Sequence, residues 1–231
     1  MNGFCHDFQK DCKHYFRLLS RYEGFGDATT KNWGLGSVMP SMYDIDPGPA
    51  FPEVVRVVVE IPKGSSNKFE YDKELGAFRL DRVLYSPVHY PGDYGFIPGT
   101  LASDGDPLDV LTLVEEPTFT GCIVEVRPIG VLNMVDQKQN DQKIIAVLNR
   151  DPLYSQVHAL DQIFSHLRRA IEHFFNIYKE LEGRETSTLG WGDPIEARRI
   201  ISESRKAYLA RQNRVKPVSA ASPTEWNSGG G

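Results

Sequence analysis

The sequence is poor in cysteine and contains no long apolar run. Its 231 residues include 3 cysteines, an odd number that fits a reducing compartment better than a disulfide framework. No stretch approaches the roughly 20 apolar residues that a membrane-spanning helix needs. The N-terminus also lacks the apolar segment and small-residue cleavage site of a secretion signal. We therefore expect a cytoplasmic protein that has no membrane partner.

An excess of positive charge is lacking as well. The chain has 26 Lys and Arg residues against 31 Asp and Glu residues, which gives a net charge of -5. Proteins that bind nucleic acids in general take most of their affinity for phosphate from excess Lys and Arg. We expect no nucleic-acid partner, although a local anion site remains compatible with this charge.

Several catalytic and metal-binding motifs are also missing. The sequence has no G-x-x-x-x-G-K-[ST] loop, no G-x-S-x-G and no arrangement of Cys and His that would form a nucleophile. An EF-hand beginning at Asp104 would have Asp109 at the position that requires glycine, and its flank is typical of a strand. These absences argue against a Walker-type NTPase, a serine or cysteine hydrolase and a calcium sensor.

The chain is expected to form one domain with two extensions. Residues 1–50 are interrupted by glycines and prolines and predict an irregular N-terminal extension, whereas residues 51–214 predict the folded domain. Residues 215–231 are rich in Ser, Pro and Gly, which is typical of a disordered tail. The extension contains four potential zinc ligands, Cys5, His6, Cys12 and His14. Their spacing matches no standard zinc motif, so we expect a flexible arm there.

The folded domain is expected to be mainly β. Segments that are β-branched or alternate in polarity predict strands at residues 54–61, 68–72, 77–84, 110–114, 121–135 and 144–149. Residues 90–99 contain too many glycines and prolines for a regular element, and residues 137–140 predict a polar loop. Apolar residues at a spacing of three to four predict a helix over 163–181, and Asp193-Pro194 begins a second helix that reaches about Arg211.

The most distinctive stretch is Asp104-Gly105-Asp106-Pro107-Leu108-Asp109, which has three carboxylates in six residues. Glycine and proline favour a tight turn, so the three acids are expected to converge. Carboxylates that converge repel one another, and a hard divalent cation relieves that repulsion. Taken alone, the hexapeptide is equally compatible with a solvated acidic turn.

Other charged residues stand out because they lie on or beside the expected strands. Arg82 occupies the apolar face of its strand and needs an anionic partner there, and Lys68 and Glu70 share a face of the preceding strand. A hairpin is expected to bring Asp136, Asp141 and Lys143 to one rim. Acids together with bases suit a complex of Mg²⁺ with phosphate, because the cation binds carboxylates while Lys and Arg neutralise the remaining phosphate charge.

These residues occur in an order that resembles one known family. The matching elements are Val59-Glu60-Ile61-Pro62, Lys68-x-Glu70, Asp81-Arg82, Tyr90-Pro91-x-x-Tyr94-Gly95, the Asp104–Asp109 stretch, Asp136-x4-Asp141-x-Lys143 and Tyr178-Lys179. This pattern is similar to that of family I soluble inorganic pyrophosphatases, and in particular to their prokaryotic branch. The resemblance implies an α+β, mainly β fold: a closed five-stranded OB-like β-barrel with two flanking C-terminal helices. It also implies a homohexamer.

The resemblance further implies hydrolysis of inorganic pyrophosphate to two orthophosphates, with Mg²⁺ as cofactor and a metal-activated water as nucleophile. By position, Asp106 resembles the general base. The implied metal ligands are Asp104, Asp109, Asp136 and Asp141; the implied substrate contacts are Lys68, Arg82, Tyr94, Lys143, Tyr178 and Lys179; the implied supporting residues are Glu60, Glu70 and Tyr90. The alternative is an OB-like module that binds a polyanion or divalent ions without turnover, since such barrels often bind oligonucleotides.

Overall fold

The structure is a computed structural model that describes residues 41–215. The four cysteine and histidine residues discussed as zinc ligands lie outside the described residues, as do most of the expected N-terminal extension and residues 216–231. Neither of the two α-helices in the described part of the chain has the length and apolar character needed to cross a bilayer.

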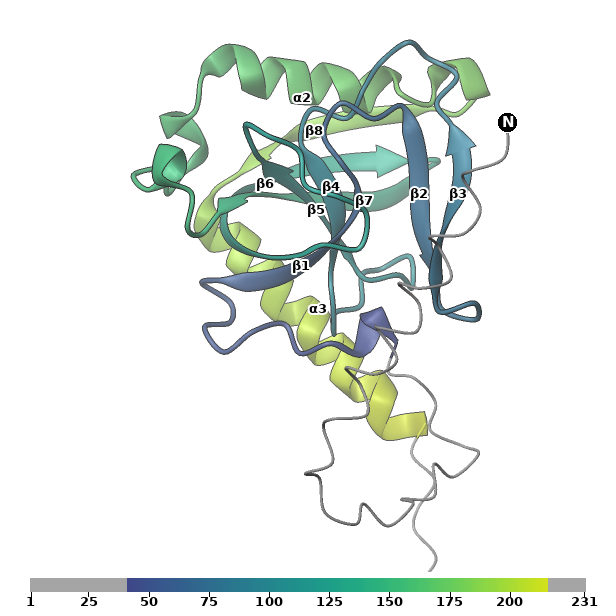
Figure 1. Ribbon diagram of the computed structural model, residues 1–231, viewed down its shortest axis with the longest axis vertical. Coiled ribbons are helices and arrows are strands. Elements are labelled where there is room, and N and C mark those ends of the chain that lie inside the picture. Colours follow the sequence, from purple (N-terminus) through teal and green to yellow (C-terminus); the bar gives the residue numbers. More distant parts are fainter. Residues whose placement is uncertain (1–40, 216–231) are drawn as a thin grey trace, which may run out of the picture. The chain divides into compact units, whose positions relative to one another are not determined.

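Five strands form a closed ring (Figure 1). The strands in ring order are β1 (Val55–Ile61), β4 (Asp93–Ile97), β5 (Leu108–Leu113), β7 (Gln139–Leu148) and β6 (Ile123–Asp136), and β6 pairs again with β1. All neighbours are antiparallel except β5 and β7, which run parallel. The predicted five-stranded closed barrel is confirmed.

Three further strands lie outside this ring. Strand β8 (Thr186–Gly192) extends the sheet beyond β6. Strands β2 (Asn67–Asp72) and β3 (Ala77–Val83) form a separate two-stranded sheet, and no backbone ladder joins that hairpin to a barrel strand within residues 41–215. The hairpin must therefore be held to the barrel by side chains and by isolated hydrogen bonds.

Two helices pack on the barrel, as predicted. Helix α2 (Ser165–Ile177) buries Ile171, Phe174 and Phe175, which join a core cluster with inward-facing residues of the strands. Helix α3 (Pro194–Val215) packs through Ala197 and Ile201 against a second cluster on the other side of the sheet. Both helices thus stabilise the barrel by burying apolar surface.

The expectation that residues 90–99 contain no regular element is wrong, because they include strand β4. All five residues of β4 are buried. Gly95 permits its pairing with β1, since a Cβ atom at that position would lie 2.0 Å from the carbonyl oxygen of Val58. Close approach of two backbones is a typical use of glycine inside a strand, and it was mistaken here for a loop signal.

Two other expectations also need correction, and one strand was not expected. The helix predicted over 163–181 is shorter, because α2 ends at Ile177 and is followed by the 3₁₀ helix η4 (Glu180–Glu182), which a left-handed Gly183 closes. The polar loop predicted at 137–140 is a two-residue turn at Gln137 and Lys138, and β7 already begins at Gln139. Strand β8 was not predicted, because two glycines interrupt its alternation.

Candidate active site

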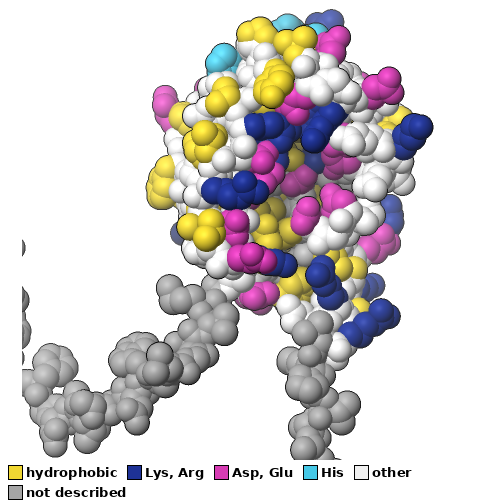
Figure 2. Space-filling model, turned by 90° about the vertical axis from the view of Figure 1, so that its right-hand side faces the viewer, with side chains coloured by type: hydrophobic (Ala, Val, Ile, Leu, Met, Phe, Trp, Pro, Cys, Tyr) yellow, Lys and Arg dark blue, Asp and Glu magenta, His cyan; other side chains and the backbone are white. Residues whose placement is uncertain are grey.

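One face of the molecule carries a hollow around which basic and acidic side chains gather (Figure 2). A cavity of about 290 Å³ is lined by thirteen of the fourteen residues that the sequence indicated as site residues. They are Glu60, Lys68, Glu70, Tyr90, Tyr94, Asp104, Asp106, Asp109, Asp136, Asp141, Lys143, Tyr178 and Lys179. Residues separated by more than a hundred positions in the chain therefore meet in one place.

The acidic turn lies at the edge of this cavity. The backbone N–H of Asp106 donates to Asp104 Oδ1 at 3.1 Å, and the N–H of Ala102 donates to the Asp106 carbonyl at 2.7 Å. Gly105 has a φ of 97°, a conformation that a residue with a Cβ rarely adopts. The turn therefore depends on this glycine, and β5 begins directly after it and carries Asp109.

A buried lysine joins two of the aspartates. Lys143 is 3 % exposed, and its ammonium lies 2.6 Å from Asp141 Oδ1 and is hydrogen-bonded to Asp109 Oδ2. Burial alone lowers the pKa of Lys143, but Asp109 and Asp141 outweigh that effect, so its pKa is raised and the ammonium stays charged. Burial raises the pKa of Asp141, and Lys143 opposes that shift.

The carboxylate of Asp136 is only half satisfied by the protein. Its Oδ2 accepts a hydrogen bond from Lys179, which lies between α2 and η4, whereas its Oδ1 is buried and has no partner among the described residues. A buried carboxylate oxygen without a donor is costly. This oxygen is therefore suited to a ligand of positive charge.

Arg82 does not line the cavity, but it is connected to residues that do. Its Nε donates to Glu182 at 2.9 Å and its Nη1 donates to Asp81 at 2.5 Å, and Asp81 also lies 3.7 Å from Lys68 Nζ. The sequence predicted anionic partners for this arginine, and the structure supplies two. The Nη2 atom is buried and unpaired in the described part of the chain, so it remains available to an anion.

Three tyrosines form the floor of the cavity. Tyr90, Tyr94 and Tyr178 are all buried, and burial raises the pKa of each hydroxyl. They pack with Phe174 and Phe175 of α2, with ring centroids between 4.9 and 6.2 Å apart. The hydroxyls therefore stay protonated at neutral pH and are available as hydrogen-bond donors.

Two further carboxyl groups have raised pKa values. Burial raises the pKa of Glu60 to about 8, even though Glu60 Oε1 accepts a hydrogen bond of 2.8 Å from the Tyr71 N–H. Burial also raises the pKa of Asp106, and the nearby charges of Asp104 and Asp109 raise it further. A carboxylate with a raised pKa accepts a proton more readily.

Comparison with known proteins places this geometry in a family. The family model for inorganic pyrophosphatases matches residues 57–209. A Nostoc sp. inorganic pyrophosphatase is 50% identical over 157 residues, which are 68% of this chain and 93% of that protein. One from Methanosarcina mazei is 48% identical over 160 residues, or 69% of this chain and 95% of that protein.

A solved structure of this family is similar in fold as well. The crystal structure of inorganic pyrophosphatase from Thermus thermophilus superposes with a TM-score of 0.72 at 42% identity, covering 74% of this chain and 99% of that chain. The chain belongs to the inorganic pyrophosphatase family. The first 56 residues precede the part that the family model matches.

The carboxylate donors of the cavity suit a hard divalent cation. Asp104, Asp109, Asp136 and Asp141 offer only carboxylate oxygens, the ligands that such cations prefer. Among residues 41–215, no three His, Cys, Asp or Glu side chains are already gathered closely around one point. The ammonium of Lys143 is paired with both Asp109 and Asp141, and that of Lys179 is paired with Asp136, so lysines rather than a shared cation partner these carboxylates here. Asp136 Oδ1 remains without a partner among the described residues.

Four other residues of the 290 Å³ cavity were not predicted from the sequence. Tyr43, Tyr71, Phe96 and Pro107 also line it. The strict alternation of β2 predicted Tyr71 on the face opposite Lys68 and Glu70, so it gave no signal that Tyr71 lines the same cavity. Tyr43 had no such signal either, because it lies in the irregular segment before β1.

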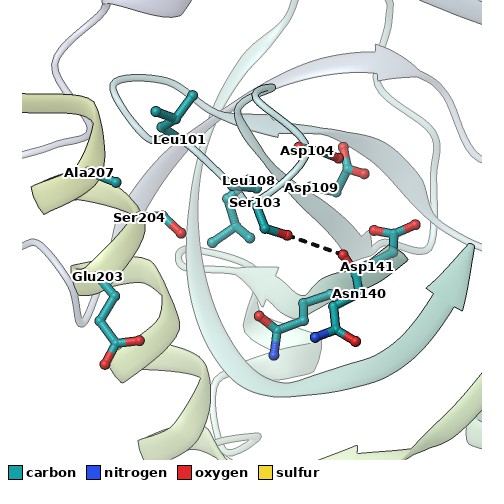
Figure 3. A pocket seen from close by; sticks show the side chains of 12 residues that line it. Leu101, Ser103, Asp104, Leu108, Asp109, Asn140, Asp141, Glu203, Ser204 and Ala207 are labelled. Atoms are coloured by element: carbon teal, nitrogen blue, oxygen red, sulfur yellow. Dashed lines mark hydrogen bonds between the residues drawn. The ribbon is translucent and has the colours of Figure 1, made fainter. Parts of the chain in front are cut away.

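A second cavity, of about 260 Å³, adjoins the first (Figure 3). It lies between residues 101–109, the start of β7 and helix α3, and it shares Asp104, Asp109 and Asp141 with the first cavity. Figure 3 shows these aspartates across the cavity from Glu203 of α3. The Ser103 hydroxyl donates to the Asn140 carbonyl at 3.3 Å, which links the acidic turn to β7.

Proposed function

We propose that this protein hydrolyses inorganic pyrophosphate to two orthophosphates, with Mg²⁺ as its cofactor. The observation that carries the proposal is the single cavity in which carboxylates, ammonium groups and tyrosine hydroxyls all meet. Membership of the inorganic pyrophosphatase family supports the same substrate. When bound, Mg²⁺ would neutralise phosphate charge and lower the pKa of a water in its coordination shell.

Four aspartates would hold the metal. Asp104 and Asp109 flank the acidic turn, and Asp136 and Asp141 come from the facing β6–β7 hairpin. Their oxygen-only donor set and the buried, unpaired Asp136 Oδ1 support this assignment.

Asp106 would act as the general base. It lies between two proposed ligands in the turn, and burial followed by the neighbouring carboxylates raises its pKa. In the reaction a water oxygen forms a bond to one phosphorus, the bond from that phosphorus to the bridging oxygen breaks, and Asp106 takes the proton of the water. The bridging oxygen then remains on the second phosphate, which leaves with the electron pair of the broken bond.

The basic and phenolic groups would bind and orient the substrate. The ammonium groups of Lys68, Lys143 and Lys179 border the cavity, and each is paired with a carboxylate in this structure. An anionic substrate offers these ammonium groups new partners when a divalent cation takes over the carboxylates. Arg82, through its unpaired Nη2, and the protonated hydroxyls of Tyr94 and Tyr178 would donate further hydrogen bonds to phosphate oxygens.

A phosphate-release assay tests the proposal. The protein, stripped of metal by chelation and dialysis, is given pyrophosphate with and without added Mg²⁺. We expect release of two orthophosphates per pyrophosphate that depends on Mg²⁺ and returns when Mg²⁺ is added back. Binding of pyrophosphate by calorimetry without any phosphate release would favour the alternative of a non-catalytic binding module. Turnover that persists after exhaustive chelation would contradict the role of the metal.

The resemblance to prokaryotic pyrophosphatases also supports a homohexamer in the cytoplasm, which we propose as the working assembly. The small number of cysteines agrees with a reducing compartment. Sedimentation of the purified protein tests the assembly: we expect one species of six chains, and a stable monomer at micromolar concentration would contradict it.

A further inference from the structure

Tyr43 connects two parts of the site from a segment that precedes the residues matched by the family model. It belongs to the 3₁₀ helix η1 (Met42–Asp44), whereas the family model begins at residue 57. Its hydroxyl donates to the Tyr71 carbonyl of β2 at 3.1 Å, and its own carbonyl accepts a bond of 2.6 Å from the Gly99 N–H. Its ring meets those of Tyr71 and Phe96 edge to face, at centroid distances of 5.2 and 4.9 Å.

The element that Tyr43 contacts has few other polar attachments. The β2–β3 hairpin shares no ladder with the barrel in residues 41–215, yet it carries Lys68, Glu70 and Arg82. On β2, both backbone polar groups of Tyr71 are hydrogen-bonded outside the hairpin. Its N–H donates to Glu60 of β1, and its carbonyl accepts from the Tyr43 hydroxyl.

We propose that Tyr43 is a positioning residue of the pyrophosphate site, which docks the β2–β3 hairpin on the barrel and so holds Lys68 at the cavity. This inference rests on the proposed function, since Lys68 matters here as a substrate contact. Tyr43 itself lines the cavity, beside Glu70 and Asp106. Burial, followed by the charges of Glu60 and Asp106, raises the pKa of Tyr43, so its hydroxyl remains a donor.

Removing the hydroxyl alone is the sharpest perturbation. Tyr43→Phe keeps the ring contacts with Tyr71 and Phe96 but leaves the Tyr71 carbonyl without this donor. A hairpin that is less firmly docked holds Lys68 less precisely, and the substrate is then bound more weakly. We expect KM for pyrophosphate to rise about fivefold, the effect of one hydrogen bond, while kcat stays within about twofold.

Tyr208→Phe is the matched control. The Tyr208 hydroxyl donates to Asp44 Oδ1 at 2.5 Å, so this variant also removes a tyrosine hydrogen bond from the η1 segment. Tyr208 lies on α3 and does not line the cavity. We expect its KM and kcat to stay within about twofold of the parent. An unchanged KM in Tyr43→Phe, or equal changes in both variants, would overturn the proposal.

Hydrogen exchange of the metal-free protein provides a readout that needs no turnover. In Tyr43→Phe we expect amides of residues 67–83 to exchange about tenfold faster, with those of β5 and β7 unchanged. Unchanged exchange in the hairpin, or equally faster exchange in the barrel, would overturn the docking role. A protein without phosphate release would refute the proposed function, and the exchange data would still decide whether Tyr43 docks the hairpin.

Discussion

Lys143 Nζ lies 2.6 Å from Asp141 Oδ1, and the two residues are two positions apart on the same face of β7. The same ammonium is hydrogen-bonded to Asp109 of β5, the strand that runs parallel to β7. One buried cation therefore pairs with two carboxylates that we propose as metal ligands, and it offsets one of their two negative charges. This relationship makes the stability of the metal-free protein depend on Lys143.

Replacing Lys143 by methionine should destabilise the metal-free protein. The variant keeps most of the side-chain volume but leaves Asp109 and Asp141 without their cation, and breaking a buried pair in this way costs about 3 kcal/mol. Added Mg²⁺ should stabilise the variant more than the parent, because it supplies the missing positive charge. Urea unfolding with and without Mg²⁺ measures both effects.

Lys138→Met serves as the control for this variant. Lys138 lies in the exposed turn between β6 and β7, so its removal should change the unfolding free energy by less than about 0.5 kcal/mol. Equal losses in the two variants would mean that the buried ion pairs of Lys143 contribute nothing particular to stability.

Glu60 should make stability depend on pH. Burial raises its pKa to about 8 in the folded protein, against roughly 4.3 in an unfolded chain. The folded state thus binds this proton more tightly. The stability that the protonated Glu60 contributes to the folded state is fully present below about pH 4.3 and is lost as the pH rises towards 8. Glu60→Gln cannot ionise and still offers an oxygen to the Tyr71 N–H.

The stability of Glu60→Gln relative to the parent should therefore increase with pH. At pH 5 the difference should be small, and at pH 9 the variant should be more stable by about 3–5 kcal/mol. Urea unfolding of both proteins in the presence of a chelator, at these two pH values, gives the difference. A difference that does not change between pH 5 and pH 9 would show that Glu60 is ionised in the folded protein.

Shortening the N-terminus should have two distinct results. A chain that retains residues 41–231 should keep its kcat/KM within about twofold, because no predicted site residue precedes residue 41 and the family match begins at residue 57. A chain that begins at Ile45 lacks Tyr43 and should show a higher KM. Steady-state kinetics of the two proteins separate the outcomes, and a tenfold loss in the longer chain would show that residues 1–40 contribute to the site.

The barrel was predictable largely from a resemblance, and its strands from local pattern. The β-branched run of β1 and the capping acid of α3 are local signals, and the structure has a strand and a helix there; the N–H of Glu196 donates to Asp193 Oδ1 at 2.8 Å. Strand β4 was missed because its Gly95 is required by the backbone of β1, which lies more than thirty residues away in the sequence.

In the site too, some residues could be predicted from the sequence and others depend on contacts between distant segments. The charged residues of the acidic turn and of β7 could be predicted as one site because the order of their motifs resembles that of a known family; taken alone, the acidic turn was equally compatible with a solvated turn. The pairing of Arg82 with Glu182 could not, because a hundred residues separate them and their contact depends on how η4 packs beside the hairpin. Tyr43 was missed for a similar reason, since its partners Tyr71 and Phe96 are set by tertiary structure.

The roles within the acidic turn predict different responses to Mg²⁺. Asp109→Asn removes a charged oxygen from a proposed metal ligand, so it should raise the Mg²⁺ concentration needed for half-maximal rate and recover partly at high Mg²⁺. The Asp109→Asn variant should therefore lose affinity for Mg²⁺. A half-maximal Mg²⁺ concentration equal to that of the parent would remove Asp109 from the ligand set.

The most direct test of the account is the rate of phosphate release by Asp106→Asn across a full Mg²⁺ titration. Loss of a general base typically lowers the rate by about 10²–10⁴-fold, and added metal does not replace it. We predict that kcat of Asp106→Asn stays at least about a hundredfold below that of the parent at every Mg²⁺ concentration. Recovery of the parental rate at high Mg²⁺ would contradict the assignment of Asp106 as the base, and with it the proposed mechanism.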